Sequence, residues 1–168
     1  MPFYTKKQYW HKSGFTLIEL VVVIAVLAIL FGIMLVIVNP EQQFKKARDA
    51  KRLSNLNVLA EAIQEYHLDN GTYPDSADTT RFSTVSAVGG SLSDSTGGWI
   101  DVDLSKFMPV MYIDPVNDAT YYYSYRHDGV GFEIDATLES YLENGKNTSD
   151  GGNNDNKLEM GNKLTVLD

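Results

Sequence analysis

The chain has 168 residues, enough for one modest domain with its own core, and its lack of cysteine excludes disulfide bonds and thiolate metal sites. The net charge of −8 is unevenly distributed, because residues 53–168 carry six Lys or Arg against nineteen Asp or Glu, a net of −13. Such an acidic region repels phosphate backbones, so we predict that this part of the chain does not bind nucleic acid.

Residues 1–14 form a short basic segment that holds three lysines and no acid and ends in Gly14. Five further basic residues follow the next, apolar segment, within residues 41–52. Membrane proteins carry an excess of Lys and Arg on their cytoplasmic flanks. Three basic residues before the apolar segment and five after it therefore leave the orientation of a membrane span undecided.

Residues 15–38 are an apolar run of 24 residues, interrupted only by Thr16, Glu19 and Gly32. As a helix this run is about 36 Å long, enough to cross a hydrocarbon core of roughly 30 Å. A cleavable secretory signal is the competing interpretation. Its apolar region has about 7–15 residues and is followed by a small-residue cleavage site. The longer run here, followed by "VIVNPEQQF", favours a transmembrane helix.

Residues 39–72 continue as an amphipathic helix. Its apolar residues recur every three or four positions, which is one stripe of a helix that we expect to pack against the rest of the chain: Phe44, Ala47, Ala50, Leu53, Leu56, Leu59, Ile63 and Tyr66. Asn39 and Pro40 can start a new helix as cap and first residue, or Pro40 can kink one continuous helix. Gly71 is expected to end the helix in a left-handed conformation.

The remaining segment, 73–168, is predicted to be a globular head. Residues 75–98 are rich in Ser, Thr, Gly and Asp and indicate a long connection with little regular structure. Residues 121–126 and 132–139 form a predicted hairpin, in which Phe132, Ile134 and Ala136 face the core and Glu133 and Asp135 face water. Alternate tyrosines of 121–125 are expected in the core. The whole chain is thus predicted to have an α+β fold.

The carboxy-terminal part, 121–168, combines this sheet with a polar, glycine-rich loop at 144–161. Further short strands are predicted near 157–160 and 163–167. Asp150, Asn153 and Asp155 offer oxygen ligands for calcium, but their spacing differs from the twelve-residue calcium loop, which favours a solvated loop.

No catalytic constellation is visible, because the three histidines are scattered along the chain and no phosphate-binding glycine loop or Ser/His/Asp grouping occurs. We therefore expect that the protein is not an enzyme and needs no cofactor, with calcium as the one open question.

The stretch "SGFTLIEL" at 13–20, preceded by a basic leader and followed by a long apolar helix, resembles the amino terminus of type IV pilins and of the pseudopilins of type II secretion. The stretch "ARDAKRLSNLNVLAEAIQEYHLDNGTYP" at 47–74 is similar to the second half of the pilin helix. The resemblance covers about residues 8–74 and implies a long helix packed on a small antiparallel sheet, with the 75–98 loop variable and on the filament surface. Some pseudopilins bind calcium in a carboxy-terminal loop.

The resemblance also implies residue roles. Gly14 would precede the bond cut by a prepilin peptidase, and Phe15 would become the N-methylated amino terminus. Glu19 would be the assembly carboxylate. A charge in hydrocarbon costs roughly 2.5–3.5 kcal/mol near a helix centre and less near an interface. Among packed helices, Glu19 needs a cation, and the freed amine of a neighbouring Phe15 supplies one. Without these roles, Glu19 would be an interfacial residue of a simple anchor.

Gly32 and Pro40 both weaken helical hydrogen bonding, and we hypothesise that the helix unwinds between them in a filament, as in other filaments of this family. The resemblance implies a single-pass precursor in the bacterial inner membrane that becomes part of an extracellular filament. Its implied partners are copies of itself, prepilin peptidase, an inner-membrane assembly platform and, before assembly, membrane lipid.

Three functions remain open. The chain is a type IV pilin that serves adhesion, twitching motility or DNA uptake, the major pseudopilin of type II secretion acting as a periplasmic piston, or a single-pass anchor that displays an acidic binding domain. The pseudopilin pattern continues after "DP" with tryptophan and glycine, which "DPVNDATYYY" at 114–123 lacks. This difference favours the pilin.

Overall fold

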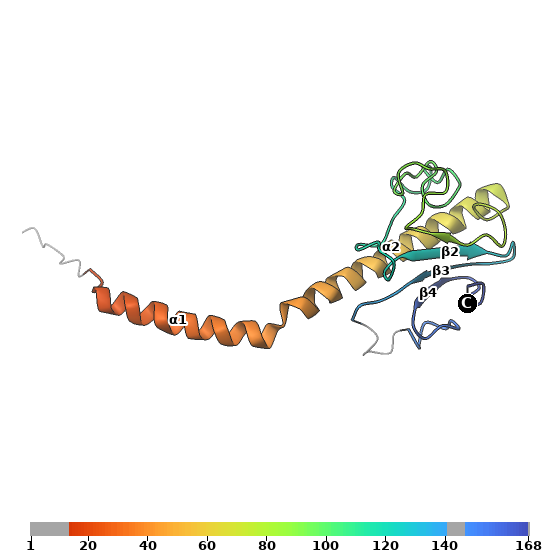
Figure 1. Cartoon of the computed structure of the whole chain (residues 1–168). Helices are drawn as coiled ribbons and strands as arrows, with labels where there is room; N and C mark the ends of the chain where they lie inside the picture. The colour runs from red at the N-terminus through yellow and green to blue at the C-terminus, as the bar shows by residue number, and fades with distance from the viewer. Residues whose placement is uncertain (1–13, 141–146, 168) are drawn as a thin grey trace, which may run out of the picture. The chain divides into compact units, whose positions relative to one another are not determined.

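The computed structural model describes residues 14–140 and 147–167 (Figure 1). It contains helices α1 (Leu17–Val38) and α2 (Pro40–Asn70) and strands β1 (Arg81–Phe82), β2 (Tyr123–His127), β3 (Phe132–Ala136) and β4 (Leu158–Gly161). The chain divides into two units, one ending at Pro40 and the other starting at Glu41. The long apolar helix and the four-stranded antiparallel sheet confirm the predicted α+β class. Residues 1–13 of the predicted leader lie outside the described residues.

Helix α1 is apolar on every side. Thr16 is its N-cap, and the helix runs without interruption to Val38. A helix that is apolar all round is buried in a large core or in a membrane. Within the described residues, the window Leu17–Met34 is the one long and apolar enough to cross a membrane, and its mean hydropathy is 3.0. The described part of the chain does not pack over this window, because 0% of the window is buried.

Asn39 separates the two helices. Its φ of 41° is left-handed, a conformation that Asn tolerates better than most residues, and it makes Asn39 the C-cap of α1. Pro40 is the first residue of α2, where its missing N–H leaves no helical hydrogen bond unmade. The structure therefore has a new helix start at Pro40 rather than one continuous helix with a kink.

Helix α2 buries only part of its predicted stripe. Leu56, Leu59 and Ile63 are fully buried in the core of the head. In contrast, Phe44 is 65% exposed, and the two alanines at positions 47 and 50 are also exposed, which corrects the prediction for the first part of the stripe. In this first part of α2, the buried side chains are polar instead of apolar. Gly71, with φ 74°, ends the helix as predicted, and its N–H donates to the carbonyl of His67 at 2.8 Å.

The four strands form an antiparallel sheet in the order β1-β2-β3-β4, and α2 lies along one face of it (Figure 1). Tyr123 and Tyr125 are fully buried, as expected for alternate tyrosines of β2. The hydroxyl of Tyr125 donates to the carbonyl of Pro74 at 2.9 Å, and that of Tyr123 accepts from the Asn55 amide at 3.0 Å. Each buried phenol therefore keeps a hydrogen-bond partner, which offsets the cost of removing it from water.

Two expectations for the head need correction, and a third is confirmed. Among the described residues, 163–167 contain no strand, because the N–H groups of Val166 and Leu167 donate to the Glu133 carboxylate instead of to a sheet ladder. Glu133 and Asp135 do not face water but are 0% and 2% exposed. The segment 75–98 has little regular structure, as predicted, apart from the two-residue strand β1.

The segment after this loop supplies core residues that the sequence analysis did not assign. Four of its side chains are among the largest that are fully buried: Trp99, Leu104, Met108 and Met111. The indole N–H of Trp99 donates to the carbonyl of Tyr112 at 2.9 Å. This irregular segment therefore contributes as much to the core as a regular element would.

A buried ionic network joins α2 to the segments before and after the hairpin. Arg52 is 0% exposed and donates two parallel hydrogen bonds to Asp114, at 2.6 and 2.9 Å. The remaining guanidinium nitrogen, Nη1, donates to Asp49 at 2.8 Å and to Glu139 at 2.6 Å. Arg48 also donates to Glu139, from Nε at 2.7 Å. Two cations and three carboxylates thus satisfy one another in and beside the core.

The position of Glu139 in this network predicts an acid-dependent loss of stability. Hydrogen bonding from Arg48, and then from Arg52, lowers the pKa of Glu139 to about 2. A carboxyl whose pKa is lower in the folded than in the unfolded state stabilises the fold above the unfolded value of about 4.5 and loses this effect as pH falls towards 2. We expect the melting-temperature difference between the wild type and Glu139→Gln to be largest near pH 7 and to shrink between about pH 4.5 and 2. Replacing the exposed Glu61 by Gln is the control. A difference that stays constant with pH would contradict this assignment.

Candidate functional site

The start of α1 is organised by a reciprocal contact between Thr16 and Glu19. The Thr16 backbone N–H and hydroxyl both donate to Glu19 Oε2, each at 2.8 Å, and the Glu19 N–H donates to the Thr16 hydroxyl at 3.3 Å. This is a capping box, which satisfies N–H groups that have no partner within the helix. Glu19 therefore has a local role at the helix start, beside any role between subunits.

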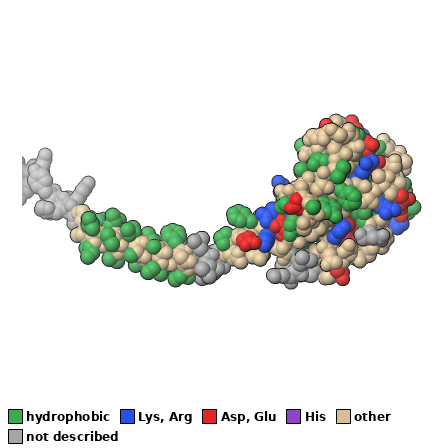
Figure 2. All heavy atoms as spheres, viewed as in Figure 1, with side chains coloured by type: hydrophobic (Ala, Val, Ile, Leu, Met, Phe, Trp, Pro, Cys, Tyr) green, Lys and Arg blue, Asp and Glu red, His purple; other side chains and the backbone are tan. Residues whose placement is uncertain are grey.

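Exposed apolar side chains surround this carboxylate. Phe15 is 88% exposed, Leu17 81% and Ile18 70%. Figure 2 shows hydrophobic side chains along the visible face of α1, whereas Lys, Arg, Asp and Glu side chains are visible on the head. Burying such a surface in lipid or against similar helices is strongly favourable, at roughly 25 cal/mol per Å² of apolar area removed from water. The exposed apolar surface of α1 therefore favours its burial in a membrane or against other helices.

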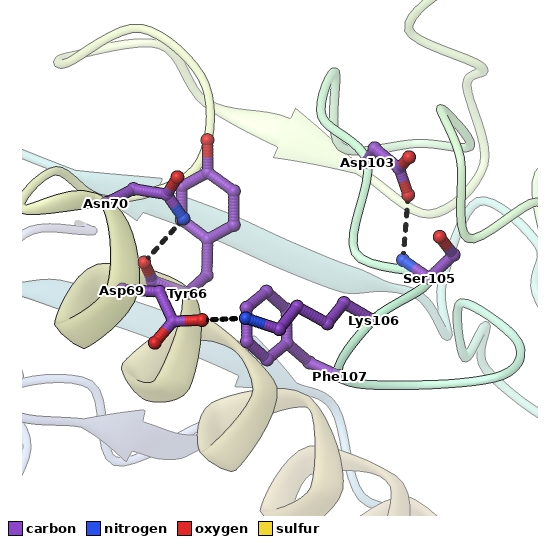
Figure 3. A pocket seen from close by; sticks show the side chains of 7 residues that line it. All are labelled: Tyr66, Asp69, Asn70, Asp103, Ser105, Lys106 and Phe107. Atoms are coloured by element: carbon purple, nitrogen blue, oxygen red, sulfur yellow. Dashed lines mark hydrogen bonds and ion pairs between the residues drawn. The ribbon is translucent and has the colours of Figure 1, made fainter.

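The head has a surface hollow of about 510 Å³ beside the end of α2 (Figure 3). Its polar groups already serve the fold, because Lys106 pairs with Asp69 and Asp103 accepts from the Ser105 N–H at 2.9 Å. The ring of Tyr66 packs edge-on against Phe107 at a centroid distance of 6.0 Å. These lining groups therefore already have partners within the fold.

Comparison with known proteins agrees with the features of α1. Residues 11–35 match the family described as the prokaryotic N-terminal methylation motif. The chain is also 43% identical over 63 residues to the type II secretion system core protein G of Aeromonas hydrophila. The amino-terminal segment is that of the type IV pilin and pseudopilin superfamily. The second alignment covers 38% of the chain and 43% of the Aeromonas protein, so the chain spans less than half of that relative. No solved structure has significant similarity to the chain.

The three predicted residues of the pilin motif lie together at the start of α1. Gly14 precedes the helix, is exposed and has open space around its Cα. Phe15 follows it, and Glu19 lies in the first turn. The cleavage, N-methylation and assembly roles of these residues stay predictions.

Gly32 and Pro40 lie in different settings in this pilin-like chain. Gly32 is inside the uninterrupted α1, where a side chain would meet nothing within 4 Å. Pro40 directly follows the break at Asn39. The hypothesis that the helix unwinds between them concerns the filament. A filament reconstruction with unbroken helical hydrogen bonds from Leu30 to Gln43 would contradict it.

The candidate calcium ligands of the carboxy-terminal loop have different surroundings. Asp150 accepts from the N–H groups of Gly152 and Glu159, at 3.1 and 3.0 Å, and the Asn153 N–H donates to Glu159. Asp155 is exposed. Residues 144–146 of this loop lie outside the described residues.

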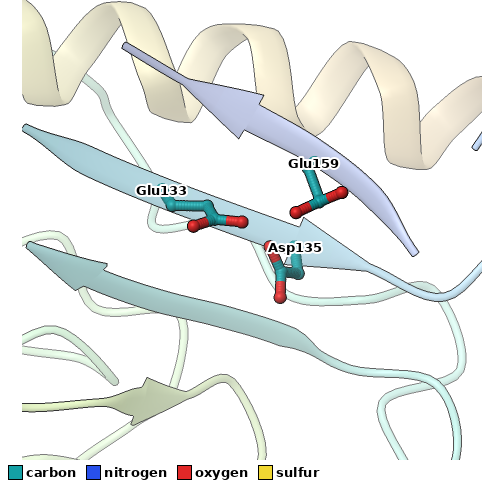
Figure 4. Close-up of side chains that lie close together, drawn as sticks. All are labelled: Glu133, Asp135 and Glu159. Atoms are coloured by element: carbon teal, nitrogen blue, oxygen red, sulfur yellow. The ribbon is translucent and has the colours of Figure 1, made fainter. Parts of the chain in front are cut away.

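The structure instead brings together three carboxylates that the sequence analysis placed in water or did not mark, Glu133, Asp135 and Glu159 (Figure 4). A strand alternates its side chains between two faces, and acids at alternate positions are typical of a solvated face. No sequence signal separates that common case from a face that a later segment covers.

Proposed function

We propose that the chain is a structural subunit of a type IV pilus-like filament, matured by prepilin peptidase and polymerised through α1. The observation that carries the proposal is an apolar helix, exposed on all sides, that begins with a glycine, an aromatic residue and a carboxylate in the order of the prepilin motif. Before assembly, lipid covers this helix. In the filament, other copies of α1 cover it.

The chemistry of assembly follows from the position of Glu19. Cleavage after Gly14 creates a positive amine at Phe15, and Glu19 lies about 6 Å further along the helix. The carboxylate of one subunit then pairs with the amine of another, in an environment from which water is excluded. Charged hydrogen bonds in such surroundings are short and strong. The pair sets the axial register of neighbouring subunits.

The proposal includes partners and a route. The precursor spans the inner membrane once through α1, a prepilin peptidase removes the leader, and an assembly platform in that membrane adds subunits to an extracellular filament. The acidic head faces the surroundings of the filament, where its net negative charge keeps it soluble. Adhesion and twitching motility are the uses we expect for such a filament.

A second candidate is the major pseudopilin of a type II secretion system. The similarity to core protein G from Aeromonas favours it. The two candidates differ in the length and location of the filament. Electron microscopy of material sheared from cells that express the protein separates them, because a pilus is recovered as long surface fibres and a periplasmic pseudopilus is not.

Blocking leader removal tests the proposal directly. In Gly14→Val, a β-branched side chain occupies the position next to the scissile bond, and we expect the chain to keep its precursor mass and to form no fibres. The measurements are intact-mass spectrometry after co-expression with prepilin peptidase and microscopy of the sheared fraction. Gly71→Ala, at the other end of the helices, is the control for glycine substitution and should be processed normally. A wild-type leader that stays uncut would instead support the simple membrane anchor.

A further inference from the structure

Three carboxylates are buried together on one face of the sheet, Glu133 and Asp135 on β3 and Glu159 on β4 (Figure 4). They are 0%, 2% and 3% exposed. Side chains alternate along a strand, so these residues lie on the face opposite to Ile134 and Leu158, which pack in the core. An oxygen of each carboxylate lies within 4.8 Å of an oxygen of the other two.

The register of the sheet makes this arrangement costly by itself. Asp135 and Glu159 are direct partners across the antiparallel pair β3–β4. Like charges directly opposite each other destabilise a sheet. Three ionised carboxylates in this place therefore need a compensating positive charge.

The carboxy-terminal segment covers the cluster and orients it. The N–H groups of Val166 and Leu167 donate to Glu133 Oε2 at 2.6 and 2.8 Å. Those of Asn153 and Asn154 donate to the two oxygens of Glu159, at 3.2 and 2.9 Å. The loop approaches so closely that a Cβ at Gly152 would lie 1.9 Å from Glu159 Oε2.

Two oxygens of the cluster remain unused after these contacts. Glu133 Oε1 and Asp135 Oδ1 are buried and have no hydrogen-bond partner. Within the described ranges, Lys157 is the one cation at ion-pair distance, 3.1 Å from Asp135. One positive charge against three carboxylates leaves two negative charges, which is the charge that one divalent cation balances.

We propose that Glu133, Asp135 and Glu159 form a calcium site that fastens the carboxy-terminal segment to the sheet. Calcium binds oxygen ligands at 2.3–2.6 Å, so ligand atoms on opposite sides of the ion are roughly 4.6–5.2 Å apart. The three ligand oxygens lie within 4.8 Å of one another, below the largest separation that one such ion allows. Asp150, which accepts from the N–H of Glu159, is a fourth carboxylate at the same edge. The three proposed ligands therefore come from strands β3 and β4. The exposed Asp155 of the loop is not one of them. This site does not depend on filament formation.

The test measures thermal stability of the full chain in detergent, with and without calcium. Trp99 is fully buried in the head, so its fluorescence reports unfolding there. At pH 8 and constant ionic strength, 1 mM calcium chloride in place of a chelator should raise the melting temperature by roughly 5 °C or more, as expected for an ion present at about a hundred times its dissociation constant. Titration calorimetry should give one calcium ion per chain.

Two variants make the result specific. Glu159→Gln keeps the shape of the side chain but removes one ligand charge, and it should abolish the calcium-dependent shift. Asp155→Asn removes an exposed acid of the same loop and should leave the shift unchanged. A shift that survives in Glu159→Gln but not in Asp155→Asn would overturn the proposal in favour of a loop site.

The proposal also fails if the wild type neither binds calcium nor gains stability from it. In that case a proton held within the cluster, and not a cation, offsets its negative charge. Should Glu159→Gln not fold, the stoichiometry of calcium binding by the wild type and by Asp135→Asn decides the question, with one ion and none as the expected values.

Discussion

Replacing Glu19 by glutamine is expected to abolish filament formation without affecting leader cleavage or the head. The amide oxygen of glutamine can still accept from the Thr16 N–H, which now bonds to Glu19 Oε2, so the helix keeps its cap. What the variant loses is the negative charge that, in the proposed assembly, pairs with the freed amine of a neighbour. Removing one partner of a buried ion pair is strongly destabilising, and in the proposed filament this loss recurs at every subunit.

The measurement combines three observations on cells that co-express the assembly proteins. Intact-mass spectrometry should show mature Glu19→Gln subunits, immunoblots should find them in the membrane, and electron microscopy should find no fibres in the sheared fraction. Glu41→Gln is the matched control, because Glu41 is a well-exposed acid that pairs with Lys45 on α2. Normal fibres built from Glu19→Gln subunits would disprove the proposed ion pair.

Arg52→Ala is expected to destabilise the head by about 3–5 kcal/mol. The change leaves Asp114 and Asp49 buried without their cation, and both are almost completely inaccessible to water. It also removes a contact of the guanidinium with the Tyr121 ring, at 4.9 Å from its centroid. Arg52→Lys should lose less, because lysine restores the charge but not the two parallel hydrogen bonds to Asp114.

Thermal unfolding of the full chain, followed by Trp99 fluorescence, checks this prediction. We expect the melting temperature of Arg52→Ala to fall by more than about 10 °C. Arg126→Ala is the matched control, since Arg126 pairs with Asp78 at the surface and such pairs contribute about 0–1 kcal/mol. Equal effects of the two substitutions would mean that the buried network does not stabilise the fold as its geometry indicates.

Local patterns predicted the elements that are specified by neighbouring residues. The apolar run gave α1, Gly71 gave the end of α2, and the alternating residues around "HDGVG" gave the hairpin of β2 and β3. These signals work because helix ends, turns and strand alternation depend on residues only a few positions apart. The same approach misplaced a strand at 163–167, where the backbone binds a side chain from β3 instead of another strand.

The amino-terminal site was predictable for the same reason. Gly14, Phe15 and Glu19 lie within six consecutive residues, so their arrangement follows from the sequence once the segment is helical. The buried polar groups of the head were not. Asp49 and Arg52 share a helix face, but their partners Asp114 and Glu139 are 62 and 87 residues away from Arg52. Pairing at such separations depends on how the chain packs.

The sequence by itself determined that this protein has an apolar helix with one early carboxylate, an amphipathic second helix and an acidic head with a hairpin. Only the tertiary structure decided which charged side chains leave water. Along a strand, charged residues alternate with core residues in the same way, whether water or another segment of the chain covers their face of the sheet. What differs is whether a distant segment, such as residues 150–167, folds over them and donates its backbone N–H groups. Burial of a charge is therefore a property of the packed chain, because its cost and its compensation come from groups remote in sequence.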